Sequence, residues 1–351
     1  MNIKERAERF RKIIEVNSEF HIVLAQVDPD AIGSAFALMH GISTLRPPGP
    51  ASTVRIFYGG SLGHPQNRAI VNKYGLQKTM EPYSRRPEAP NAVTILVDSS
   101  NRADKRFGDN VRIEPLIIID HHRTDEKFTE DEGKLYWIED CGSASTLVIE
   151  LLVALNISLA EMKPSSILAG LGIYSDTHNL VDATSRDRGA FAECAKGFNH
   201  QDFAELVNHP LPETYYRNLE RALRDSKIDR GRLVTGLGFL TPEEADDLST
   251  IAEQLIRREA VTMVVVWGIV NGNVRISARN DNLSQPLEGF LQKRFGPEAG
   301  AKLTPAGRGE GGALLRLPFA EWVLKPEPGA EVKRQLEESV SARVCELVFQ
   351  D

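Results

Sequence analysis

Acidic residues and histidines follow apolar runs at four places in the first 180 residues of the chain. In sequence order they are Asp28 and Asp30, then Asp98, then Asp120 with His121 and His122, and finally Asp176. Carboxylates that share one edge of a sheet repel one another strongly unless cations relieve them. One such acid alone is more often a helix cap or a surface residue. Five in these positions favour a metal site, and two bridged cations are the arrangement that hydrolyses phosphoesters.

Strands that alternate with helices would bring these side chains together. The runs 21–27, 53–58, 92–97 and 116–119 predict buried strands, and helical patterns follow at 35–44, 147–155 and 164–171. This alternation predicts an α/β fold whose first domain has a doubly wound parallel sheet. Ligands of such sheets bind beyond the carboxyl ends of the strands, so we expect all five aspartates at that edge.

The pattern changes after residue 230. A strand at 232–240, a hairpin around Asn271-Gly272, a glycine-rich loop at 307–312, a strand at 313–317 and a helix at 332–348 predict a smaller, mixed-sheet α/β domain. The segment between the two domains is dense in charge and helical. We therefore expect domains at 1–195 and 231–351, a helical linker at 196–230, and an active-site cleft between the domains.

Composition narrows the function classes. The net charge of −7 argues against binding of long nucleic acid but allows short nucleotides held by metal ions and a few arginines. Carboxylate and imidazole donors suit Mn²⁺ or Mg²⁺, or a borderline metal such as Zn²⁺ or Co²⁺. No stretch approaches a membrane span, the N-terminus lacks an apolar signal core, and three scattered cysteines do not form a disulfide framework. A cytoplasmic location is expected, with no membrane partner.

Four ordered segments resemble the motifs of the DHH phosphoesterase family. They are Asp28-Pro-Asp-Ala-Ile-Gly-Ser34, Val97-Asp98, Asp120-His-His122 and Gly172-Ile-Tyr-Ser-Asp-Thr177. Ser277-Ala-Arg279 and the glycines at 307–312 resemble the associated C-terminal domain of the same family. The layout is most similar to nanoRNases, oligoribonucleases and 3′-phosphoadenosine 5′-phosphate phosphatases. The resemblance implies hydrolysis of short oligoribonucleotides or small nucleotide phosphates by a metal-bound hydroxide.

The resemblance also implies a role for each motif residue. Two Mn²⁺ ions are expected, or one, with Mg²⁺ or Co²⁺ as substitutes. Asp98 would bridge the metals, Asp28 would bind the first, and Asp30, His121 and Asp176 would bind the second. His122 would be catalytic at the scissile phosphate, and Asp120 would orient the histidines. Substrate would contact the second domain at Arg279, Gly307, Arg308, Gly309, Glu310, Gly311 and Gly312.

Two departures from the family pattern leave other functions open. Leu24 stands where the family has a metal-binding histidine, and Glu310 replaces the histidine of the family's Gly-Gly-Gly-His pattern. Gln26 and His178 are the candidates to supply the missing ligand. The alternative is therefore a catalytically weakened nucleotide-binding sensor or scaffold. A cyclic-dinucleotide phosphodiesterase or a pyrophosphatase is the third reading, and a homodimer is compatible with any of them.

Overall fold

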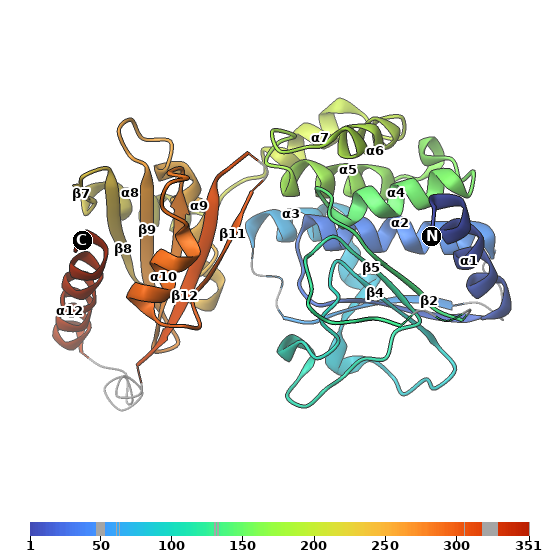
Figure 1. The fold of residues 1–351 in the computed structure, drawn as a ribbon, viewed down its shortest axis with the longest axis horizontal. Coiled ribbons are helices and arrows are strands. Elements are labelled where there is room, and N and C mark those ends of the chain that lie inside the picture. Colours follow the sequence, from blue (N-terminus) through green and yellow to red (C-terminus); the bar gives the residue numbers. More distant parts are fainter. Residues whose placement is uncertain are drawn as a thin grey trace. The chain divides into compact units, whose positions relative to one another are not determined.

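The computed structural model describes residues 1–46, 53–60, 62, 64–129, 131, 133–304, 306–317 and 329–350. The chain divides into two compact units, Met1–Pro210 and Leu211–Asp351 (Figure 1). The segment 196–230, read as a linker from the sequence, contributes one helix to each unit. Within the described residues, no helix is long and apolar enough to cross a membrane. The glycine-rich stretch 59–63 lies partly outside the described residues.

The first unit is built on a six-stranded sheet in which every pair of neighbours is parallel. Its strands are β1 (Glu19–Leu24), β2 (Thr53–Tyr58), β3 (Met80–Pro82), β4 (Val93–Val97), β5 (Ile117–Asp120) and β6 (Leu135–Ile138). The order β3-β2-β1-β4-β5-β6 reverses direction between β1 and β4. The crevice beyond the strand ends at such a reversal is where open α/β sheets bind their ligands.

The helices of the first unit gather along one side of its strands (Figure 1). They are α1 (Ile3–Val16), α2 (Pro29–Leu45), α3 (Pro65–Tyr74), α4 (Ala144–Ala154), α5 (Ser165–Asp176), α6 (Ser185–Ala195) and α7 (His200–Val207). On this face Ile22 and Ile95 belong to the main hydrophobic core, whereas on the other face Val23 and Leu96 pack with Phe107. Burial on both faces explains why the central strands read as continuous apolar runs.

Helix geometry differs from expectation at two of the acidic segments. The turn after β1 is the start of α2, because Asp28 is the N-cap and Pro29 the first helical residue. Asp176 is the last residue of α5, so it ends a helix that continues beyond the predicted end at residue 171 and does not stand at the end of a strand. The apolar residues before it are buried by helix packing, since a Cβ at Gly33 of α2 would lie 2.5 Å from the Leu168 carbonyl oxygen of α5.

The second unit has a mixed sheet in the order β11-β12-β10-β9-β8-β7, in which only the β8–β9 pair among these strands is parallel. Its elements are α8 (Glu213–Arg224), β7 (Lys227–Asp229), β8 (Arg232–Leu240), α9 (Asp247–Leu255), β9 (Met263–Val270), β10 (Asn273–Asn280), α10 (Leu287–Phe295), β11 (Gly300–Leu303), β12 (Gly309–Arg316) and α12 (Ala330–Phe349). Positive φ values of 50° at Asn271 and 74° at Gly272 form the expected β9–β10 turn.

The predicted fold class is confirmed: the first sheet is parallel and the second, in the smaller unit, is mixed. One local prediction in the second unit is wrong. Residues 309–312 are the start of strand β12, paired with β10 on one side and β11 on the other, and are not a loop. Two neighbouring strands approach closely here, which requires residues without a Cβ. A cleft between the units stays a prediction.

Candidate metal centre

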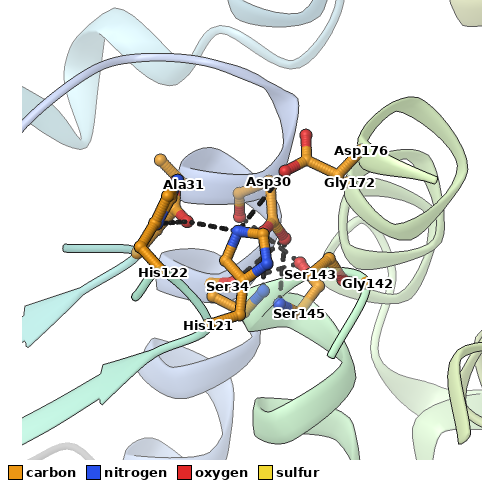
Figure 2. Close-up of polar contacts among 12 residues, drawn as sticks. Asp30, Ala31, Ser34, His121, His122, Gly142, Ser143, Ser145, Gly172 and Asp176 are labelled. Carbon is orange, nitrogen blue, oxygen red and sulfur yellow. Dashed lines mark hydrogen bonds and ion pairs between the residues drawn. The ribbon is translucent and has the colours of Figure 1, made fainter. Parts of the chain in front are cut away.

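The imidazole of His121 lies among three carboxylates from different parts of the first unit. Its Nε2 atom is 3.5 Å from an oxygen of Asp98, 3.5 Å from Asp176 and 3.8 Å from Asp30. Figure 2 shows Asp30 and Asp176 pointing toward this ring. Nε2 is buried and has no hydrogen-bond partner among the described residues. A buried nitrogen left without a partner is costly unless another group binds there.

The other ring nitrogen of His121 fixes which atom faces the acids. Nδ1 lies 3.0 Å from the carbonyl oxygen of Cys141, and because a carbonyl can only accept, Nδ1 carries the proton. In the neutral ring the lone pair is then on Nε2, toward the carboxylates, as in a metal-binding histidine. Burial by itself lowers the pKa of His121, but the charges of Asp30 and Asp176 outweigh it and raise this pKa.

Asp30, in the first turn of α2, is completely buried and also caps α4. Its two carboxylate oxygens accept hydrogen bonds from the backbone N–H of Ala144, at 2.7 Å, and of Ser145, at 2.9 Å. These contacts place a carboxylate at the positive end of a helix dipole. A Cβ at Gly172 would lie 2.8 Å from the Cα of Asp30 and 2.7 Å from the Ser145 hydroxyl (Figure 2). Gly172 thus lets α5 bring Asp176 beside Asp30.

Asp98 and Asp176 complete the group of carboxylates. Asp98 directly follows β4 and has a φ of +58°, a conformation that costs free energy in a residue other than glycine and is typical of functional sites. Burial, followed by the charges of Asp30, Asp28 and Asp98, raises the pKa of Asp176 well above the ordinary carboxyl value. The four aspartates therefore repel one another, as expected of carboxylates arranged to share a cation.

Asp120 and His122 form a pair beside this group. The Nδ1 of His122 lies 2.8 Å from Asp120 Oδ1, which also accepts the backbone N–H of His122. Burial by itself raises the pKa of Asp120, but the hydrogen bond from His122 and the charge of His122 outweigh burial and lower this pKa. His122 itself is exposed and, with His121, borders an open pocket of about 610 Å³ whose lining includes Arg123, Phe128 and Tyr136.

Asp28 lies at the edge of the group and its carboxylate already has a partner. Oδ1 accepts the backbone N–H of Ala31 at 2.9 Å, which is the capping role of a helix N-cap. Burial raises the pKa of Asp28 to about 6, against the opposing effect of that hydrogen bond. Leu24 is fully buried in the hydrophobic core and offers no donor atom. The candidate replacements are otherwise engaged: the Gln26 amide oxygen accepts from Arg106, and His178 contacts Asp182.

The residues of this group fit a divalent cation. Among the described residues two sets have ligand atoms within 4.8 Å of one another, namely Asp30, His121 and Asp176, and Asp98, His121 and His122. Donors that each lie about 2.1 Å from one ion are separated by about 3–3.5 Å, close to the distances measured around His121. Oxygen donors with one or two imidazoles suit Mn²⁺, Mg²⁺ or Co²⁺. We call these residues with Asp28 the acidic cluster.

The substrate-binding residues predicted in the second unit also meet. Arg279 of β10 lies opposite Glu310 of β12, with Nε 3.8 Å from its carboxylate, and Arg308 immediately precedes β12. Both guanidinium groups contact acids that the sequence did not single out, Glu253 of α9 and Asp281. We call these five residues the arginine cluster.

The predicted glycines of the second unit serve strand packing in this structure. A Cβ at Gly311 would lie 2.4 Å from the Gly300 carbonyl oxygen, and one at Gly312 would lie 2.3 Å from that of Ile276. Gly309 is paired in the same strand, and Gly307 precedes it with a φ of +87°. Contact of these glycines with a substrate phosphate stays a prediction.

Backbone groups are the part of the site that sequence reasoning missed. The Cys141 carbonyl orients His121, and the Ala144 and Ser145 amides hold Asp30. In the sequence, the only indication of these backbone groups was the segment Cys141-Gly-Ser-Ala-Ser145 before an apolar helix. Gly142 in that segment is required because a Cβ there would lie 2.6 Å from an Asp187 oxygen.

Comparisons with known proteins find similarity to one protein family and to several proteins. Residues 21–173 match the family model described as "DHH family, N-terminal domain". The uncharacterised protein MJ1633 of Methanocaldococcus jannaschii is 25% identical over 352 residues, which cover 98% of this chain and 67% of that protein. Cyclic-di-AMP phosphodiesterase GdpP of Geobacillus thermodenitrificans is 26% identical over 182 residues, 48% of this chain and 26% of that protein.

A solved structure supports the fold of the whole chain. An exopolyphosphatase-related protein from Bacteroides fragilis superimposes with a TM-score of 0.64 and 17% identity, covering 96% of this chain and 97% of that one. At this identity the likeness concerns the fold.

Proposed function

Because residues 21–173 match the model of the DHH family's N-terminal domain, we propose that this chain is a divalent-metal-dependent phosphoesterase acting on short oligoribonucleotides or small nucleotide phosphates. The observation that carries the proposal is His121 Nε2, facing Asp30, Asp98 and Asp176 while Cys141 holds the opposite nitrogen. Residues 231–351 would be the associated substrate-binding domain, and Mn²⁺ is the proposed metal.

The residues in and beside the acidic cluster would have different roles in hydrolysis. A bound divalent cation would activate water and offset the negative charge at phosphorus. Asp98, whose Oδ1 lies 3.5 Å from His121 and 3.8 Å from His122, is the proposed bridging ligand. His122, oriented through Nδ1 by Asp120, would hold a proton at Nε2 for the oxygen that leaves the phosphate. The open pocket beside His122 would accept the part of the substrate next to that phosphate.

A second candidate function keeps the binding site without turnover. It is favoured by Leu24, an apolar residue in the core where a ligand is expected, and by Asp28, which is used as a helix cap. A chain of this kind would hold one metal or none and would bind nucleotide without hydrolysing it. The similarity to GdpP makes cyclic dinucleotides a third class of substrate to test, and pyrophosphate is tested beside them.

The deciding experiment is a substrate panel with the bound metal counted in parallel. Purified chain would be loaded with Mn²⁺ or Mg²⁺ and offered a dinucleotide, 3′-phosphoadenosine 5′-phosphate, cyclic-di-AMP and pyrophosphate. We expect hydrolysis of one of the first two, and loss of both metal and hydrolysis in His121→Gln. The exposed His200, at the start of α7, supplies the control His200→Gln. Tight nucleotide binding with no turnover of any substrate would favour the sensor instead.

A further inference from the structure

A carboxylate in the second unit joins the two arginines of the arginine cluster. One oxygen of Glu253 accepts a hydrogen bond from Arg279 Nε at 2.9 Å, and its other oxygen accepts one from Arg308 Nη1 at 2.7 Å. Arg279 is on β10, Arg308 immediately precedes β12 and Glu253 is on α9, so one carboxylate of a helix joins side chains from two strand segments. Two guanidinium groups converging on one anion is how proteins bind phosphate.

The rest of the arginine cluster limits its attraction for outside anions. Asp281 contacts Arg308 through both oxygens, at 2.6 and 3.2 Å, and Glu310 lies 3.8 Å from Arg279. Two positive charges therefore face three carboxylates. A ligand phosphate that approaches the arginines meets this negative charge first.

We propose that Glu253 is an internal anion that occupies the position of a ligand phosphate between Arg279 and Arg308, and that it sets which phosphates the second unit binds. A ligand has to displace Glu253, so a weakly charged anion is excluded and a more highly charged phosphate end is selected. Glu253 is thus a specificity-determining residue. The inference rests on the proposed function only in assuming a phosphate-containing substrate.

Displacement of Glu253 is physically accessible. The exposed fraction of the side chain is 25% for Glu253 and 28% for Arg308, so water reaches the contact between them. The carboxylate can therefore turn to solvent without opening the core. A phosphate dianion forms stronger charge-assisted hydrogen bonds with a guanidinium fork than a single carboxylate does. Exchange of one anion for the other therefore requires only a change of rotamer on the face of α9.

Anion binding to the metal-free chain tests the proposal without requiring hydrolysis. Inorganic phosphate and pyrophosphate would be titrated calorimetrically into full-length protein in EDTA. We expect Glu253→Gln to bind pyrophosphate about tenfold more tightly than the unmodified chain, because a like charge is removed from the site. Glu259→Gln, an equal change at an exposed residue just beyond α9, should leave binding unchanged. Adding Arg279→Gln to Glu253→Gln should abolish the gain.

Each other result contradicts the proposal. If Glu253→Gln binds pyrophosphate no more tightly than the unmodified chain, Glu253 only forms a structural ion pair with the arginines. The same conclusion follows if the double variant with Arg279→Gln keeps the gain in pyrophosphate binding. If circular dichroism shows that Glu253→Gln is unfolded, Glu253→Ala makes the same test. Absence of anion binding in every folded variant overturns the proposal. A chain that hydrolyses nothing but passes this test would disprove the proposed function alone.

Discussion

The acidic cluster and the arginine cluster both gather charged side chains, but they balance charge differently. In the acidic cluster three aspartates surround the partly buried imidazole of His121, and burial together with the repulsion among the aspartates raises the pKa of Asp176. In the arginine cluster every carboxylate contacts a guanidinium group. Carboxylates that lie mainly beside one another favour a cation from outside, whereas carboxylates that each contact a guanidinium group mainly hold the structure together and select among ligands.

The largest expected effect comes from removing one charge from the acidic cluster. Asp176→Asn should lower Mn²⁺-dependent hydrolysis by about 10³-fold, because a proposed metal ligand is lost. In EDTA the same variant should be more stable than the unmodified chain by about 1 kcal/mol, since a mutual repulsion is relieved. Hydrolysis rates and thermal unfolding in EDTA measure the two effects.

Asp109→Asn is the matched control, because Asp109 is an exposed carboxylate outside the cluster and outside the pocket beside His122. It should change neither quantity appreciably. If Asp176→Asn keeps activity within tenfold of the original, or melts at a lower temperature in EDTA, the acidic cluster is not a metal centre of the kind proposed.

The central strands, and the site residues at their carboxyl ends, could be predicted because burial on both sheet faces leaves a clear sequence pattern. Val93–Val97 and Ile117–Asp120 are continuous apolar runs, and their carboxyl ends converge in any parallel sheet. Asp98, Asp120 and His121 were therefore placed together from the sequence. The predicted helix at 164–171 ended too early, because Gly172 and Ser175 are weak helix formers, and α5 in fact continues to Asp176.

Contacts made by tertiary packing left no signal in the sequence. The sequence around Glu253 indicates only a solvated helix residue. In the structure α9 packs against β10, and this packing brings Glu253 to Arg279. The glycines at 309, 311 and 312 look like a phosphate loop, but the close approach of β11 and β10 accounts for two of them. Backbone partners such as the Cys141 carbonyl are present at every residue, so the sequence cannot single them out.

A smaller effect tests whether the acidic cluster depends on helix packing. Gly172→Ala should destabilise the chain by about 1–3 kcal/mol, because the new Cβ would lie 2.8 Å from the Cα of Asp30. Gly189→Ala, also within a helix, meets nothing within 4 Å and should stabilise by about 0.4–1 kcal/mol. Urea unfolding in EDTA measures both. Equal stability of the two variants would show that α2 and α5 can separate without cost.

The smallest effect should have the opposite sign to that of Asp176→Asn. Asp281→Asn removes one negative charge from the arginine cluster, but this carboxylate makes a two-point contact with Arg308. Because the contact is partly exposed, its loss should destabilise the chain by about 0.5–1 kcal/mol, and by less in 1 M NaCl, where charges are screened. Urea unfolding in EDTA at low and high salt, with Asp176→Asn measured alongside, makes the comparison direct. Stabilisation by both variants would mean that repulsion among the carboxylates of the arginine cluster outweighs their contacts with the guanidinium groups. The distinction between a cluster built for a cation and one built from its own ion pairs would then fail.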